Sequence, residues 1–179
     1  RDGSESVRLW VDSLDGLLGL LEIGVVELHP WGATVDNIER PDTLVFGLDP
    51  GDGIEWSFVL ETAVRLRELL SAEGLDSWPK LTGGNGLHVM APIEPDLDWN
   101  ELHRYSQELA ERLAATDTQR YVTAPGPGKR HGRLFINYLS NSRGTTAIGA
   151  YSPRARRGFP VAAPVTWPVL QRGLRPDAF

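Results

Sequence analysis

A run of apolar, strand-forming residues that ends in a dense turn signal most constrains the fold of this chain. Residues 44–46 are Leu, Val and Phe, and residues 49–53 read Asp-Pro-Gly-Asp-Gly. This pattern predicts a buried strand that ends in a loop. Because side chains two apart share one face of a strand, position 47 points the same way as Asp49. A second carboxylate there would complete a metal-binding pair, but the chain has Gly47.

Length and composition predict one domain over residues 1–179. The chain is 41% hydrophobic and has no cysteine, which excludes disulfides, thiolate zinc sites and a cysteine nucleophile. No apolar run reaches membrane-spanning length and no signal peptide is visible, so we expect a cytoplasmic protein without a membrane partner. The first residue is Arg1, so we also expect a piece of a longer chain.

Charge is distributed unevenly along the chain. Residues 1–117 hold 23 acidic and 8 basic side chains, whereas residues 118–176 hold 10 basic and no acidic ones. One interpretation is solvated arginine on loops. The other is a surface for phosphates, which attract cations and are repelled by carboxylates. We favour the second, because Pro- and Gly-rich loops such as residues 124–128 suit the wall of a groove.

Apolar periodicity and turn residues predict alternating helices and short strands. Ser13 is a candidate cap for the first helix, and Asp98 with Glu101 forms a capping box for the last. The predicted helices cover residues 14–23, 56–73 and 99–113, and the predicted strands cover residues 25–28, 44–49, 76–81, 87–93 and 133–138. Basic and Pro-rich residues 151–179 are expected to wrap back over the sheet.

Two further segments carry candidate ligand groups. His29 follows the strand predicted at residues 25–28. It is either a packed or surface residue or a ligand whose direction Pro30 and Gly32 fix. Residues 82–86 read Thr-Gly-Gly-Asn-Gly, and their backbone N–H groups either form an anion nest or belong to a simple hairpin.

Asn137 ends a predicted strand in the same way that Asp49 does. Two strand ends with acidic or amide groups, a glycine-rich loop and a basic C-terminal part together suggest a site where metal and phosphate meet. In two-metal phosphoryl transfer, a carboxylate pair on one strand and a third carboxylate on a neighbour hold two divalent ions.

Six motifs give the chain a resemblance to a known family. They read ELHPWG, RPDTLVFGLDPGDG, TGGNGLHV, GRLFINYLSN, AYSPRAR and LRPDAF. In this order, from about residue 7 to residue 179, they resemble the primase-polymerase domain of bacterial DNA ligase D, in the archaeo-eukaryotic primase superfamily. The resemblance implies an α+β, palm-like domain whose mixed, mainly antiparallel sheet is flanked by helices. It also implies that the chain lacks the family's N-terminal part.

The resemblance further implies roles for single residues. His29 matches a triphosphate-contacting histidine, and Asp49 matches the second carboxylate of a DxD motif. Thr82 stands where the family usually has serine, beside Gly83 and Gly84 of a phosphate loop. Arg130 and Arg154 match basic residues that contact the incoming nucleotide. In the family this domain adds nucleotides during nonhomologous end joining, prefers ribonucleotides and manganese, and works with Ku.

The departures from the family fall where its chemistry lies. Gly47 replaces the first metal carboxylate, Asn137 replaces the third, and Asn85 replaces a lysine that faces phosphate. Asn137 could offer an amide oxygen to a metal, but it brings no charge. A magnesium or manganese ion held by Asp49 alone would therefore bind weakly or not at all.

Three functional hypotheses follow. In the first, which we favour, the domain binds nucleoside triphosphate and DNA ends but has lost polymerisation. In the second, it is an active nucleotidyltransferase whose missing metal ligands come from outside these residues. In the third, it is a non-catalytic protein-interaction module. The resemblance implies Ku and linked ligase or nuclease modules as partners, and a nucleoid-associated bacterial location.

Overall fold

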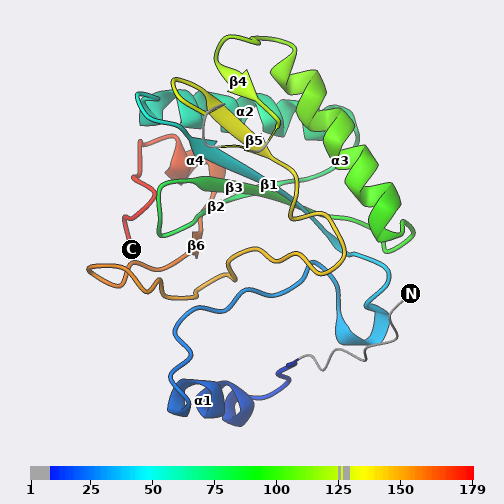
Figure 1. Ribbon diagram of the computed structural model, residues 1–179, viewed down its shortest axis with the longest axis vertical. Helices are drawn as coiled ribbons and strands as arrows, with labels where there is room; N and C mark the ends of the chain where they lie inside the picture. The colour runs from blue at the N-terminus through cyan, green and yellow to red at the C-terminus, as the bar shows by residue number, and fades with distance from the viewer. Residues whose placement is uncertain (1–8, 125, 127–129) are drawn as a thin grey trace.

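The computed structural model describes residues 9–124, 126 and 130–179, and a six-stranded sheet forms its centre (Figure 1). The strands lie side by side in the order β4-β5-β1-β3-β2-β6. All neighbouring strands are antiparallel except β4 and β5, which are parallel. Their bounds are β1 (Thr43–Pro50), β2 (Trp78–Leu81), β3 (Leu87–Pro92), β4 (Tyr121–Val122), β5 (Leu134–Asn137) and β6 (Ala163–Pro164). This arrangement confirms the predicted α+β class with a mixed, mainly antiparallel sheet.

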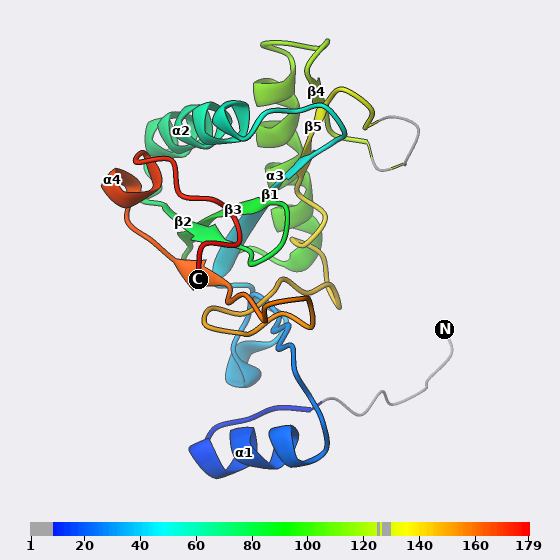
Figure 2. The same cartoon turned by 90° about the vertical axis from the view of Figure 1, so that its left-hand side faces the viewer.

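Two long helices cover one face of the sheet (Figure 2). Helix α2 (Trp56–Ala72) and helix α3 (Trp99–Ala114) bury their apolar sides against Leu44, Phe46 and Leu48 of β1 in one continuous core. The capping box predicted for α3 is present: Asp98 accepts from the N–H groups of Asn100 and Glu101. The apolar residues at helical spacing in both helices therefore pack in the core.

The opposite face of the sheet carries the polar residues. Alternation along β1 turns Gly47 and Asp49 away from the helices. Register places Asn137 of β5, Gly47, His88 of β3 and Lys80 of β2 directly beside one another across four neighbouring strands. These four residues form a row in the middle of the sheet, where the flanking strands fix the position of each residue.

Two segments that are distant in sequence cover this polar face (Figure 1). One is residues 25–33. The other includes a turn over residues 152–162, closed by a bridge between Pro153 and Val161 and here called the basic hairpin. The two segments are joined by hydrogen bonds from Gly149 N to Leu28 O (2.7 Å) and from Leu28 N to Ser152 Oγ (2.8 Å).

The strand predicted at residues 25–28 is wrong. These residues belong to no regular strand in the part of the chain that is described. Leu28 donates to the Ser152 side chain and accepts from the loop residue Gly149, so no continuous backbone ladder forms. Periodicity detected an extended, partly buried segment but could not show that its partners lie in a loop.

The ends of the chain differ in how they meet this sheet. The C-terminal part pairs β6 with β2 and adds helix α4 (Trp167–Leu170), which agrees with the predicted return over the sheet. Helix α1 (Leu14–Glu22), capped by Ser13, stands apart from the sheet with no buried residue (Figures 1 and 2). A short 3-10 helix η1 (Val35–Asn37) leads into β1. No helix among the described residues has the length and apolarity needed to cross a membrane.

Candidate functional site

The end of β1 has the geometry that the sequence predicts. A Cβ atom built on Gly47 would lie 3.6 Å from Oδ2 of Asp49 and 3.2 Å from Cβ of Asn137. Position 47 therefore faces the same space as Asp49, and Asn137 approaches from the neighbouring strand. A carboxylate at position 47 would complete a three-residue cluster here, but glycine provides no ligand atom.

Asp49 lies in a confined environment. Its Oδ2 accepts a hydrogen bond from Asn137 Nδ2 at 3.2 Å, and a Cβ on Gly86 would come within 2.7 Å of its Oδ1. Burial raises the pKa of Asp49, although the hydrogen bond from Asn137 and the positive charge of Arg130 act in the opposite direction. The glycine at position 86 is thus required for the close approach of the loop to this carboxylate.

A backbone group determines how the Asn137 amide is turned. Leu139 N donates to Asn137 Oδ1 at 3.1 Å, and a backbone N–H can only donate. The amide oxygen is therefore committed to Leu139, and the NH₂ group faces Asp49. In this rotamer Asn137 presents a donor to Asp49 where a metal ion would need an oxygen ligand.

The donor atoms do not fit a pair of divalent ions. Among residues 9–124, 126 and 130–179, no three His, Asp or Glu side chains lie close enough together to hold a metal. Asp49 is the single carboxylate of the cluster formed with Gly47 and Asn137. Magnesium and manganese require several oxygen ligands, and a single carboxylate supplies too few.

The glycine-rich loop is a hairpin that connects β2 with β3, as one of the two interpretations predicted. Thr82 Oγ1 donates to Gly86 O (2.7 Å) and accepts from Gly84 N (3.2 Å), while Gly83 N donates to Pro176 O (2.9 Å). Thr82 N also donates to Gly86 O at 3.4 Å, so three N–H groups of the predicted anion nest are already used. Gly83 has φ +65°, and a Cβ there would lie 2.8 Å from Arg154 Cγ.

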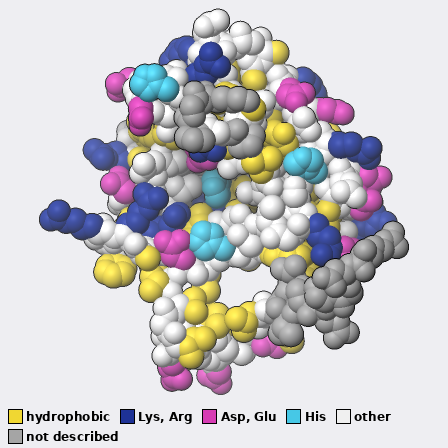
Figure 3. Space-filling model, viewed as in Figure 1, with side chains coloured by type: hydrophobic (Ala, Val, Ile, Leu, Met, Phe, Trp, Pro, Cys, Tyr) yellow, Lys and Arg dark blue, Asp and Glu magenta, His cyan; other side chains and the backbone are white. Residues whose placement is uncertain are grey.

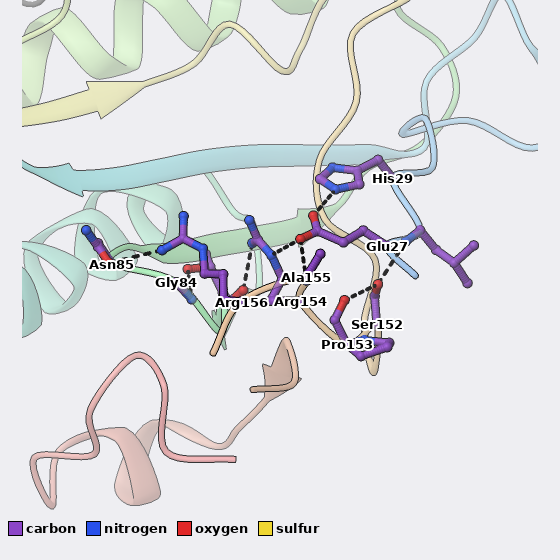
Figure 4. A network of polar contacts seen from close by, with 11 residues as sticks. Glu27, His29, Gly84, Asn85, Ser152, Pro153, Arg154, Ala155 and Arg156 are labelled. Carbon is purple, nitrogen blue, oxygen red and sulfur yellow. Dashed lines mark hydrogen bonds and ion pairs between the residues drawn. The ribbon is translucent and has the colours of Figure 1, made fainter. Parts of the chain in front are cut away.

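The basic hairpin lies against this glycine-rich loop. Arg154 Nη1 donates to Thr82 O at 2.9 Å, and Arg156 Nη1 donates to Asn85 Oδ1 at 3.3 Å (Figure 4). Two arginines thus bracket the segment that the sequence predicted to hold phosphate. Asn85, at the position where the resemblance implies a lysine, accepts a hydrogen bond instead of contributing a cation.

His29 reaches the same region from residues 25–33. Its Nε2 is 2.8 Å from Oε2 of Glu27, which also receives a hydrogen bond on Oε1 from Ala155 N at 2.8 Å (Figure 4). The hydrogen bond with His29 and that from Ala155 are the main reasons why the pKa of Glu27 is lowered to about 2. Sequence reasoning missed Glu27; its position two residues before His29 in an extended segment was the available signal.

His88 and Lys80 were also missed. Burial lowers the pKa of His88 to about 3, assisted by the charges of Lys80, Arg154 and His29, and its Nδ1 is buried without a hydrogen-bond partner. Burial lowers the pKa of Lys80 to about 8, and this lysine donates to Ile148 O. Alternation along β3 could have identified His88, because its neighbours Leu87 and Val89 are core residues.

Arg130 contacts the same face of β5 as Asn137, because Phe135 and Asn137 are two residues apart on this strand. Its guanidinium carbon lies 4.1 Å from the centre of the Phe135 ring, and its Nε is buried without a hydrogen-bond partner. The loop predicted to form a groove wall includes residues 125 and 127–129, which lie outside the described residues.

The nine predicted site residues all lie on or beside the polar face. Asp49, Asn137 and Arg130 form one group, and His29, Thr82, Gly83, Gly84, Asn85 and Arg154 form a second. Gly86 joins the two groups by its close approach to Asp49. Figure 3 shows Lys, Arg and His side chains spread over this view of the molecule, with Asp and Glu side chains among them. The arrangement offers basic and N–H donors to an anion, with the carboxylates of Asp49 and Glu27 beside them.

Comparison with known proteins shows to which family the chain is similar. The family model described as LigD, primase-polymerase domain, matches residues 1–179. A multifunctional non-homologous end joining protein LigD of Pseudomonas aeruginosa is 38% identical over 157 residues, covering 88% of this chain and 19% of the relative. A bifunctional LigD of Bacillus subtilis is 30% identical over 179 residues, covering 99% of this chain and 29% of the relative. The chain thus spans less than a third of these curated relatives.

A solved structure agrees with the sequence comparison. The polymerase domain from Mycobacterium tuberculosis Ligase D in complex with DNA superposes with a TM-score of 0.86 at 30% identity, covering 92% of this chain and 61% of that one. The sequence family and the fold agree. This chain therefore belongs to the LigD primase-polymerase domain family.

Proposed function

We propose that this domain acts in bacterial DNA end joining by binding nucleoside triphosphate and DNA phosphates, with metal-dependent nucleotide addition impaired or lost. The relatives are end-joining proteins by name, and the similar polymerase domain was solved with DNA. Ku and linked ligase or nuclease modules are the partners we propose, and the bacterial cytoplasm, at the nucleoid, is the proposed location.

The hydrogen bond from Asn137 to Asp49 carries this proposal. It shows an amide donor turned toward the remaining carboxylate, with Gly47 adding no ligand beside it. In two-metal phosphoryl transfer, the ions neutralise the triphosphate and activate the attacking hydroxyl. With two of three carboxylates replaced, neither ion has an adequate ligand set.

Phosphate binding is supported by the groups that remain. Arg154 and Arg156 lie over the glycine-rich loop, His29 lies nearby, and His88 faces the same side of the sheet. Cationic and N–H donors attract phosphate without a metal ion, although less strongly than a complete metal site does.

Nucleotide addition to a primed DNA end in the presence of manganese tests the proposal. We expect the wild-type chain to add nucleotides no faster than an Asp49→Ala variant, because Asp49 alone cannot hold the ions. The double variant Gly47→Asp/Asn137→Asp restores both carboxylates. We expect it to bind Mn²⁺ more tightly in calorimetry, after a small shift at the 3.2 Å approach of position 47 to Asn137.

Three results would contradict the proposal. Template-dependent extension by the wild type well above Asp49→Ala would favour an active nucleotidyltransferase with metal ligands supplied elsewhere. Loss of all triphosphate and DNA binding would favour a protein-interaction module. An unchanged Mn²⁺ affinity in the double variant would show that the missing carboxylates do not explain the weak site.

A further inference from the structure

Two hydrogen bonds and one ion pair, from two segments distant in sequence, converge on the carboxylate of Glu27. His29 Nε2 and Ala155 N each lie 2.8 Å from it, and Arg154 Nε forms an ion pair with it at 3.2 Å (Figure 4). Glu27 and Arg154 are 127 residues apart in sequence. One side chain therefore joins the histidine and the arginine that the proposed function assigns to phosphate binding.

We propose that Glu27 is a positioning residue, which holds His29 and Arg154 in a fixed relation and thereby sets the affinity of the site for a nucleoside triphosphate. The inference rests on the proposed function and deepens it. Glu27 itself contacts no phosphate; it acts through the two donors that do.

The hydrogen bond with Glu27 determines which nitrogen of His29 is free. A carboxylate only accepts, so the proton of this bond belongs to Nε2. Nδ1 is then the ring nitrogen left for a ligand, and it can donate to a phosphate oxygen only when the ring carries a second proton there. The side chain of His29 is 39% exposed, so a ligand can reach it.

Arg154 is held between Glu27 and the glycine-rich loop. Its Nε faces Glu27 and its Nη1 donates to Thr82 O at 2.9 Å, which leaves Nη2 for a ligand. The side chain is only 15% exposed. Arg154 Nε meets Glu27 as an ion pair without hydrogen-bond geometry, so the guanidinium is held by one hydrogen bond and one ion pair. A guanidinium held in this way loses less rotational freedom when it binds phosphate, and this preorganisation raises affinity.

The negative charge of Glu27 is balanced by the neighbouring guanidinium of Arg154. Residues 118–176 contain no acidic side chain, so Glu27 supplies a carboxylate to them from the N-terminal half of the chain. It remains ionised at neutral pH, because its donors hold its pKa at about 2. Its repulsion of a nearby phosphate is weakened by Arg154, whereas its loss would release both phosphate-binding side chains.

The backbone around Glu27 is anchored independently of its carboxylate. Leu28 N donates to Ser152 Oγ at 2.8 Å, and Gly149 N donates to Leu28 O at 2.7 Å. A Glu27→Ala variant should therefore keep the extended segment in place while losing the link to His29 and Arg154.

Titration of ATP into the full chain, with binding measured by calorimetry, tests the inference. We expect Glu27→Ala to weaken ATP binding on the order of tenfold, because two donors lose their fixed positions. Glu22→Ala removes an exposed carboxylate on α1 and should leave the affinity unchanged. Glu27→Gln, which keeps the size but not the charge, should fall between Glu27→Ala and the wild type.

Unchanged or tighter ATP binding in Glu27→Ala would overturn the inference, since tighter binding would mean that Glu27 competes with phosphate for the same donors. Nitrogen-15 NMR of the imidazoles provides a second readout. In the wild type we expect the Nε2–H form of His29, with a signal that shifts in Glu27→Ala. If the wild type binds no ATP, the proposed function fails, and an unshifted His29 signal would separately refute the link to Glu27.

Discussion

The orientation of single side chains determines what the polar face of this domain can do. Asn137 occupies the place that the sequence predicted, yet its amide is turned by Leu139 N so that a donor faces Asp49. Glu27 is likewise turned toward His29 and Ala155 by hydrogen bonds. The residue types indicated that Asp49 and Asn137 lie close together. The direction in which each side chain donates or accepts is set by its hydrogen-bond partners, and no local sequence pattern reveals these partners.

His88 should make stability depend on pH. Its pKa is about 3 in the folded chain against an ordinary value of 6.5, so between these values the unfolded state binds more protons. The free energy of unfolding should therefore decrease as the pH falls from 6.5 toward 3. Urea unfolding at several pH values measures this slope.

A His88→Gln variant is the matched comparison for that slope. It removes the titrating ring, so its stability should change less between pH 6.5 and 5, above the range in which most carboxylates titrate. If the free energy of unfolding changed equally with pH in the wild type and in His88→Gln, His88 would not be the source of the pH dependence.

At the scale of the elements, β1 is supported by a side chain where its neighbouring strand ends. Asn141 Oδ1 accepts from Val45 N, and Asn141 Nδ2 donates to Val45 O, both at 2.8 Å. The same amide nitrogen donates to Tyr138 O at 2.9 Å. Because β5 stops at Asn137, the buried Asn141 side chain satisfies backbone groups of β1 that a longer strand would have paired.

Asn141→Ala should therefore destabilise the domain by about 3 kcal/mol, since it leaves two buried backbone groups of Val45 without partners. Chemical denaturation followed by circular dichroism measures the change. Asn100→Ala, at an exposed position of α3, is the matched control and should cost well under half as much. Equal effects of the two substitutions would show that the Asn141 side chain is not what completes β1.

At the scale of the whole molecule, folding brings the basic hairpin, from the acid-free residues 118–176, onto the polar face of a sheet whose strands β1, β2 and β3 come from the earlier part of the chain. The basic hairpin lies over the glycine-rich loop, and the exposed Arg156 and Arg157 are carried by this hairpin. The chain has a formal charge of −6, so local rather than overall charge must attract phosphates.

Binding to a DNA end should therefore weaken with salt. If about three phosphates are neutralised, affinity should fall roughly 40-fold between 50 and 200 mM salt. Fluorescence anisotropy with a labelled duplex measures this slope. Arg156→Gln should reduce it by about one unit, whereas Arg172→Gln, after α4, should leave it unchanged. Affinity that is independent of salt would contradict phosphate contacts as the basis of binding.

The sequence by itself determined the three longer helices, the central strands and the shared face of Gly47 and Asp49, because these follow from local periodicity, capping and turn residues. The α+β class was implied by the resemblance of its motifs to a known family. The sequence did not determine the path of residues 25–28, the roles of Glu27 and His88, or the rotamer of Asn137. Only tertiary structure decided these features. Each depends on hydrogen bonds or strand register between segments far apart in the chain, and such pairings leave little trace in local sequence.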